Sequence, residues 1–115
     1  MGLTFSEDEL LAETDQFHVA AWYNDELVAC LILKPLSSKE LKMRQVAVTA
    51  HLQGKGLGRK LVDFCEDFGR ERGFHIMSLH AREVASMFYL KLDYEIVGEP
   101  FEEVGLPHYR MEKQL

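Results

Sequence analysis

The residues most suited to chemistry form a glycine-rich, basic segment from Gln53 to Lys60 (Gln53-Gly54-Lys55-Gly56-Leu57-Gly58-Arg59-Lys60). The apolar stretch before it has a strand pattern, and the stretch after it has an amphipathic helix pattern. Glycine at a strand-to-helix turn leaves backbone N–H groups unshielded, and the start of a helix adds unpaired donors and a partial positive charge. Basic side chains oppose that charge at a cost of up to ~1 kcal/mol each, so their presence indicates a bound anion. The segment predicts a phosphate-binding turn.

Two common phosphate-binding motifs do not fit this segment. The P-loop needs serine or threonine after its lysine, whereas Lys60 is followed by Leu61. The dinucleotide fingerprint needs a different glycine spacing, and it needs a ribose-binding carboxylate where the next strand of this chain ends in Leu79-His80. A nucleotide-binding domain is therefore disfavoured.

Two other motifs carry a family resemblance. The pattern Gln53-x-x-Gly56-x-Gly58 follows Val46-Ala47-Val48, and it closely resembles the acetyl-CoA-binding motif of the GNAT superfamily of N-acetyltransferases, (Arg/Gln)-x-x-Gly-x-(Gly/Ala). Downstream, Ala81 and the run Phe88–Glu95 resemble that superfamily's A…FYxKLGF segment, with Asp93 where glycine is usual. The resemblance covers roughly residues 17–113, in order.

The resemblance implies an α/β fold with a central mixed sheet flanked by helices. The strands at 41–49 and 74–80 would run parallel and splay apart, so that the pantetheine of acetyl-CoA lies between them. Arg82 could reach a phosphate or the ribose, or it could be an ordinary polar residue at a helix start. The residues expected to bind the cofactor are Val46, Ala47, Val48, Gln53, Gly54, Lys55, Gly56, Leu57, Gly58, Arg59, Arg82 and Tyr89.

Acetyl transfer from a thioester to an amine needs a polarised carbonyl, a base for the ammonium and an acid for the departing thiolate. The resemblance implies that a backbone N–H at or beside Val48 polarises the carbonyl, and that Tyr89 is the acid. A tyrosine of ordinary pKa, ~10, is protonated at neutral pH and can donate to a thiolate. The alternative is that Tyr89 only packs beside Phe88.

Candidates for the base lie in or beside the last loop, which borders the acceptor site in this superfamily. Histidine suits proton transfer near neutral pH, which favours His108, and Glu102 and Glu103 could hold a cationic amine. Two alternatives remain open. The glutamates could be solvated loop charges, or a chain of water molecules could remove the proton.

The elements that must position these groups follow from local patterns. The capping box Ser6-Glu7-Asp8-Glu9 predicts a short helix at about 6–14, with Phe5 and Leu10 as its hydrophobic staple. Strands at 17–23, 27–33 and 41–49 are predicted to form an antiparallel meander, followed by a helix from 57 to about 72 and a strand at 74–79. A second helix is predicted at 83–92, with Val84, Phe88 and Leu92 on its apolar face. The last two strands are predicted at 94–97 and 108–112, joined by a loop over 98–107.

Only about 16 residues precede the strand at 17–23, whereas a typical family member opens with a further strand and a longer helical region. We therefore expect the first strand to be missing. Either the chain is shortened, or the unpaired edge at 17–23 pairs with a second chain and gives a homodimer or a continuous intersubunit sheet.

Composition suits a single acetyltransferase domain over residues 1–115, because 47% of the chain is hydrophobic and 28% is charged. The sequence shows no secretory signal or membrane-spanning stretch, and we expect a cytoplasmic protein with Cys30 and Cys65 as buried thiols. The net charge of −6 argues against a nucleic-acid partner and suits a cationic acceptor. The five histidines lack ligand spacing, so we expect no metal.

The sequence thus predicts an N-acetyltransferase that moves acetyl from acetyl-CoA to a primary amine by direct attack in a ternary complex. The alternative is a non-catalytic acyl-CoA-binding module that regulates a partner.

Overall fold

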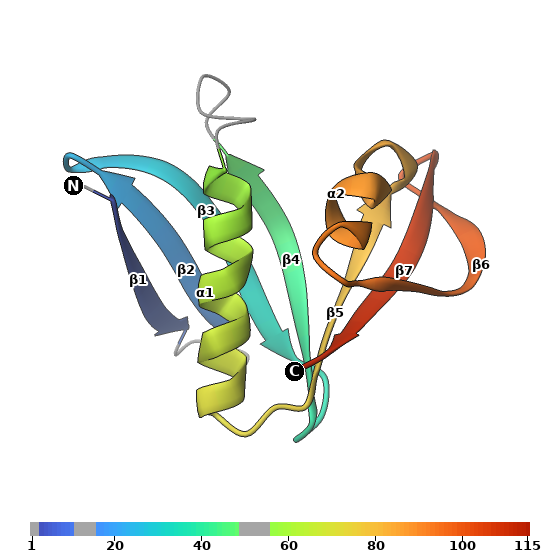
Figure 1. Cartoon of the computed structure of the whole chain (residues 1–115), viewed down its shortest axis with the longest axis horizontal. Helices are drawn as coiled ribbons and strands as arrows, with labels where there is room; N and C mark the ends of the chain where they lie inside the picture. Colours follow the sequence, from blue (N-terminus) through green and yellow to red (C-terminus); the bar gives the residue numbers. More distant parts are fainter. Residues whose placement is uncertain (1–2, 11–15, 49–55) are drawn as a thin grey trace.

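The computed structural model describes residues 3–10, 16–48 and 56–115. These residues form one seven-stranded mixed sheet, in the order β1-β2-β3-β4-β5-β7-β6, with its helices on one face (Figure 1). The predicted α/β fold with a mixed sheet is confirmed. The elements in chain order are β1 (Leu3–Leu10), β2 (Gln16–Tyr23), β3 (Glu26–Pro35), β4 (Glu40–Val48), α1 (Leu57–Glu71), β5 (Ile76–Arg82), the short 3₁₀ helix η2 (Glu83–Ala85), α2 (Ser86–Leu90), β6 (Glu95–Glu103) and β7 (Leu106–Gln114).

The predicted antiparallel meander is present as β2, β3 and β4. The turn between β2 and β3 is Asn24-Asp25, whose φ values of 50° and 68° are the left-handed pair that a two-residue hairpin loop requires. After β4 the chain crosses over through α1 and returns as β5, which runs parallel to β4. The crossover therefore brings the ends of β4 and β5 and the start of α1 to one edge of the sheet.

The N-terminal prediction was wrong. Leu3–Leu10 is a strand, not part of a helix, and it pairs with β2 along its whole length, from Leu3 opposite Tyr23 to Leu10 opposite Gln16. Phe5 stacks on Phe64 of α1, with the ring centroids 5.0 Å apart. A capping box is a local signal of about 1 kcal/mol, whereas the strand gains a full ladder of backbone hydrogen bonds and an aromatic contact. Tertiary pairing therefore overrides the local preference.

This pairing also removes the basis of two further expectations. A strand does precede 17–23, so the first strand is not missing. Both edges of β2 are occupied within the chain, by β1 and β3, so β2 cannot pair with a second chain as proposed.

The core lies between the sheet and α1. The helix buries Leu61, Cys65 and Phe68, as its periodicity predicted. At Gly69 the backbone comes so close that an added Cβ would lie 3.0 Å from a Leu115 methyl and 3.4 Å from one of Leu41. Along each strand, the residues between those that face α1 point to the other side of the sheet. One of them is Cys30, which is exposed although we expected it to be buried.

The C-terminal segment also differs from the prediction. Most of the expected loop at 98–107 belongs to the hairpin of β6 and β7, with a tight turn at Val104-Gly105. Gly98 and Pro100 are residue types typical of loops, and in the structure they lie where β6 is irregular. Four residue steps from Val97 to Phe101 lie opposite only two steps of β7. Such bulges admit glycine and proline inside a strand.

Candidate functional site

The site is a gap between two parallel strands. Pairing between β4 and β5 runs from Glu40 opposite Ile76 to Met43 opposite Leu79, and then stops, although both strands continue. The cause lies in β4, where three residue steps from Arg44 to Ala47 face two steps of β3. An extra residue of this kind bends its strand, and such bulges are common beside active sites. The predicted splay is therefore present, and Figure 1 shows the two strands diverging.

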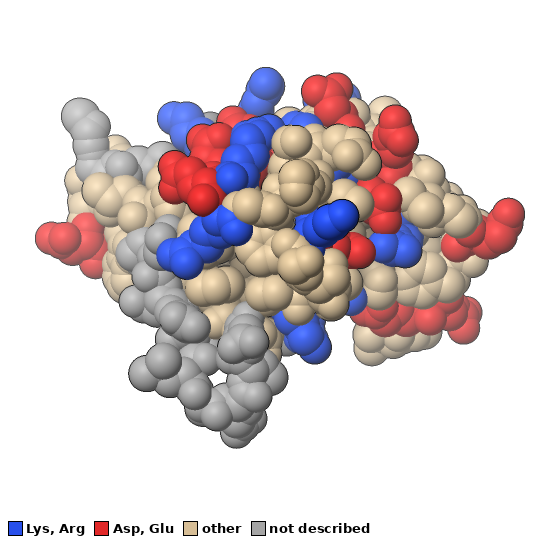
Figure 2. Space-filling model, turned by 90° about the horizontal axis from the view of Figure 1, so that it is seen from below, with Lys and Arg blue, Asp and Glu red and all other residues tan. Residues whose placement is uncertain are grey.

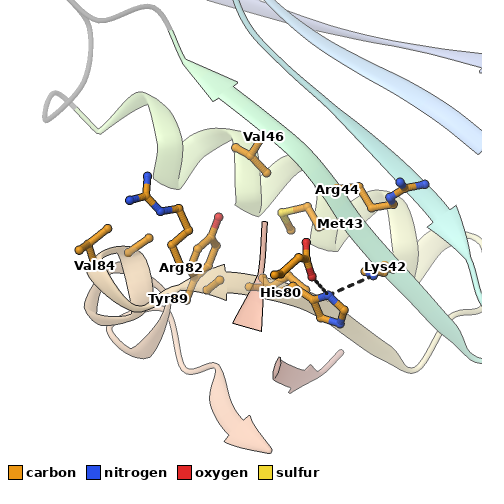
Figure 3. Close-up of a pocket in the computed structure, with 12 residues that line it drawn as sticks. Lys42, Met43, Arg44, Val46, His80, Arg82, Val84 and Tyr89 are labelled. Atoms are coloured by element: carbon orange, nitrogen blue, oxygen red, sulfur yellow. Dashed lines mark hydrogen bonds and ion pairs between the residues drawn. The ribbon is translucent and has the colours of Figure 1, made fainter. Parts of the chain in front are cut away.

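A cavity of about 490 Å³ occupies this gap (Figure 3). Four of the residues singled out from the sequence line it, namely Val46, Arg82, Tyr89 and Glu103. Ala47 and Val48 continue β4 beyond Val46. The complete lining is Lys42, Met43, Arg44, Val46, Leu79, His80, Ala81, Arg82, Val84, Ala85, Tyr89 and Glu103.

The start of α1 has the features expected of an anion-binding turn. Gly56 is its N-cap with a φ of 82°, no side chain caps the helix, and no acidic residue lies in the first turn. Within the described part of the chain, the first N–H groups of α1 thus have no side-chain cap. An added Cβ at Gly58 would lie 3.3 Å from the Phe88 ring, so glycine allows α1 and α2 to approach closely. Leu57 is buried and Arg59 is exposed, whereas Gln53, Gly54 and Lys55 lie outside the described residues.

Tyr89 combines a packed ring with a hydroxyl that faces the cavity. Its ring lies edge-on to Phe88 and Tyr94, with centroids 4.9 and 5.8 Å away. Figure 3 shows the hydroxyl pointing toward the strand that carries Val46. Burial, and secondarily the nearby Cys65 thiol, raise the pKa of Tyr89 above its ordinary value. The phenol is therefore protonated at neutral pH.

The helix that carries Tyr89 was predicted only in part. Residues 83–85 form a 3₁₀ turn and only 86–90 are α-helical. The change in helical pitch rotates the face, so that Val84 is 79% and Phe88 is 40% exposed, against our prediction. Leu92 is buried as predicted.

A histidine on β5 makes the central polar contact of the cavity. His80 Nδ1 lies 3.0 Å from a carboxylate oxygen of Glu103 and 3.5 Å from Lys42 Nζ (Figure 3). The Phe101 ring packs edge-on against the imidazole, with centroids 4.9 Å apart. The shorter contact assigns Nδ1–H as a donor to Glu103, which leaves Nε2 as the basic nitrogen of the neutral ring. Glu103, a candidate from the sequence, lines the cavity, whereas His80 had no role as a base among the sequence-based predictions.

His108, in contrast, lies away from the cavity. It is buried, its Nδ1–H donates to the Leu106 carbonyl at 2.9 Å, and its ring stacks on Phe101 with centroids 5.9 Å apart. Phe101 thus contacts both His80 and His108. The structure unites Tyr89, His80 and Glu103 around one cavity, and His108 is not in its lining. Glu102 is exposed in β6 and does not line the cavity either.

Lys42 and Arg44, which were not among the candidates from the sequence, also line the cavity. Lys42 and Arg44 alternate along β4 with buried Leu41 and Met43, so they project from the sheet face opposite α1. Burial, followed by the charge of Arg44, lowers the pKa of Lys42. The alternation itself was a signal, because a charged residue at every second position marks one strand face as polar.

Two kinds of feature are absent from the described residues. No group of three or more histidine, cysteine or acidic residues is placed to hold a metal ion in this part of the chain. Nor is any helix in it long and apolar enough to cross a membrane.

The comparison with known families agrees with this geometry. The acetyltransferase (GNAT) domain family matches residues 4–115. The chain belongs to the GNAT acetyltransferase family. Proteins of this family transfer an acyl group from acyl-CoA to an amine.

Individual relatives cover most of this GNAT chain. An uncharacterized Bacillus subtilis protein, YyaT, is 25% identical to it over 96% of the chain and 82% of its own length. A Lactobacillus plantarum protein described as an N-acetyltransferase superposes with a TM-score of 0.83 and 27% identity, covering 92% of this chain and 74% of its own. A GNAT family acetyltransferase from Elizabethkingia anophelis, solved with acetyl-CoA bound, has a TM-score of 0.79 at 14% identity, with 99% of each chain covered. The last comparison shows the shared fold alone.

Proposed function

We propose that this protein transfers acetyl from acetyl-CoA to a primary amine by direct attack in a ternary complex. The observation that carries the proposal is the gap between β4 and β5. Tyr89 lies on one side of its cavity, and the contact between His80 and Glu103 lies on the other. A cofactor and an acceptor entering from opposite faces would meet there.

The cofactor would bind along β4 and at the start of α1. The bulge in β4 frees backbone groups near Val46, Ala47 and Val48 for the pantetheine, and an N–H there would polarise the thioester carbonyl. The uncapped first turn of α1 would bind the pyrophosphate. Arg82 would reach a phosphate or the ribose. The remaining cofactor contacts proposed are those of Gln53, Gly54, Lys55, Gly56, Leu57, Gly58 and Arg59.

The reaction requires two proton transfers, and the cavity offers a group for each. His80 Nε2 would take the proton of the acceptor ammonium, while Glu103 fixes the ring tautomer and stabilises the imidazolium that forms. The free amine would then attack the carbonyl carbon, forming the C–N bond as the C–S bond breaks. Tyr89 would give its proton to the departing thiolate, and the proton that the nitrogen releases as the amide forms would restore the phenol. His108 receives no part in this scheme because it is separated from the cavity.

The test is release of free CoA thiol from acetyl-CoA in the presence of a panel of amines, with mass spectrometry of the N-acetylated product. We expect turnover that depends on the amine and yields one acetylated amine per thiol. Binding of acetyl-CoA without amine-dependent thiol release would refute the enzyme assignment and favour the non-catalytic acyl-CoA-binding module.

A variant at His80 tests the proposed base. His80→Gln should lower kcat/KM by ~10²-fold or more, the scale of general base catalysis, and should remove the acidic limb of the pH–rate profile. His75→Gln is the matched control, because His75 is exposed and lies outside the cavity. An unchanged pH profile in the His80 variant would show that water, rather than His80, removes the proton.

A further inference from the structure

The charge of the cavity is opposite in sign to that of the whole chain. Among the described residues its lining has three cations, Lys42, Arg44 and Arg82, against one carboxylate, Glu103, for a net charge of +2 with histidine neutral. The chain has a net charge of −6. Five acidic and no basic residues fall within 93–104, and Figure 2 shows acidic side chains gathered at the end of the molecule that β6 forms. The positive charge of the cavity is thus a local feature.

Two of these cations lack a carboxylate in ion-pair contact among the described residues. Neither Lys42 nor Arg44 forms an ion pair within the described part of the chain, and the contact from Lys42 is to an imidazole nitrogen. Arg110, on the same sheet face, is instead paired with Glu40 and Glu112. Burial and, second to it, the charge of Arg44 lower the pKa of Lys42, while the carboxylate of Glu103 raises it to a lesser extent, so the two cations lie close enough to repel each other. A pair of this kind favours a bound anion.

The geometry separates Lys42 and Arg44 from the proposed phosphate site at the start of α1. Gly69 of α1 packs on the sheet face that carries Leu41 and Met77, whereas Lys42 projects from the opposite face. In Figure 3 Arg82 and Tyr89 lie to one side of His80, and Lys42 and Arg44 lie to the other. The second side is the one from which the acceptor would enter.

We propose that the acceptor is a small amine that also carries a carboxylate or phosphate group, which Lys42 and Arg44 bind beside His80. This inference rests on the proposed function and names its substrate class. Lys42 Nζ is only 3.5 Å from the imidazole of His80, so the anionic group and the reacting amine lie a few bonds apart, as in an amino acid. This anionic acceptor replaces the cationic acceptor that the net charge of the whole chain suggested.

The experiment compares paired acceptors, one with and one without the anionic group. The pairs are glycine and glycinamide, β-alanine and β-alaninamide, and O-phosphoethanolamine and ethanolamine, with spermidine as a polycation. For at least one pair we expect kcat/KM, corrected for the fraction of unprotonated amine, to favour the anionic member about tenfold or more, the scale of a charge-assisted hydrogen bond. Lys42→Gln and Arg44→Gln should each reduce that ratio by about tenfold, whereas the exposed control Lys39→Gln should leave it within about twofold.

The outcomes separate this inference from the function on which it rests. Turnover that favours the uncharged members or spermidine, or a ratio unchanged in both cavity variants, overturns the anionic acceptor and leaves the acetyltransferase standing. A rise in the KM for acetyl-CoA alone in these variants would assign the cations to the cofactor and also overturn the inference. Absence of turnover with every amine refutes the proposed function, and the inference falls with it.

Discussion

Replacing Tyr89 with phenylalanine isolates the hydroxyl that is proposed to protonate the thiolate. The ring contacts with Phe88 and Tyr94 do not involve the hydroxyl, so the variant keeps them. No described residue accepts a hydrogen bond from that hydroxyl, so its loss leaves no described donor or acceptor unpaired. We therefore expect the free energy of unfolding to change by less than about 1 kcal/mol. The Kd for acetyl-CoA should stay nearly constant for the same reason.

The rate should fall much more than the affinity. General acid catalysis contributes ~10²- to 10⁴-fold, or about 2.7 to 5.4 kcal/mol of transition-state stabilisation, and this is the expected loss in kcat for Tyr89→Phe. The loss should shrink with a thioester of a more acidic thiol, whose leaving group needs less protonation. Because burial raises the pKa of Tyr89, the wild-type protein should keep this acid protonated throughout pH 7 to 9.

The assay is steady-state thiol release at saturating acetyl-CoA and amine, combined with calorimetric titration of acetyl-CoA. Tyr109→Phe is the matched control, because that hydroxyl donates to Glu83 and lies outside the cavity lining. Its kcat should stay within about twofold of wild type. A Tyr89→Phe protein with wild-type kcat would refute the reasoning and leave solvent as the proton source. Equal losses in affinity and rate would instead assign Tyr89 a packing role.

Two other predictions concern the turn and the core. Gly56 has a φ of 82°, which a β-branched residue rarely adopts, so Gly56→Val should distort the start of α1 and weaken CoA binding by at least ~2 kcal/mol in a folded protein. Unchanged affinity by calorimetry would remove this turn from the cofactor site. Burial and the neighbouring Glu66 carboxylate raise the pKa of Tyr94, so above pH ~10 the unfolded chain releases a proton that the folded chain retains. The wild-type free energy of unfolding should therefore fall by up to about 1.4 kcal/mol per pH unit from this group, and urea titrations of Tyr94→Phe between pH 9 and 11 should show a shallower fall. Equal slopes would refute the assignment.

Strong local patterns determined much of the fold. The helix α1 followed from apolar residues at regular spacing, and the meander followed from strand-length apolar runs separated by turn residues. The glycine-rich segment ending at Gly58 and the run that contains Tyr89 carried the family resemblance, and the family match over residues 4–115 confirmed it. These features depend on residues close together in sequence, so periodicity and motif spacing can detect them.

Tertiary pairing decided the rest. The capping box at residues 6–9 has the pattern of a helix start, but a neighbouring strand and the Phe64 ring make Leu3–Leu10 a strand. Likewise, Gly98 and Pro100 have the pattern of a loop, but pairing with β7 holds them in a bulged strand. In both places a non-local ladder of hydrogen bonds outweighs a local preference of about 1 kcal/mol.

The candidate site divides in the same way. The sequence by itself determined which residue types were present, including Tyr89, His80, His108 and Glu103. Only the tertiary structure decided that Glu103 contacts His80, at 3.0 Å, while His108 is turned to the Leu106 carbonyl. The physical reason is that the sheet brings together strands distant in sequence, and side-chain direction alternates along each of them. A bulge or a change of register therefore decides which of two nearby histidines reaches the cavity, and no local pattern records it.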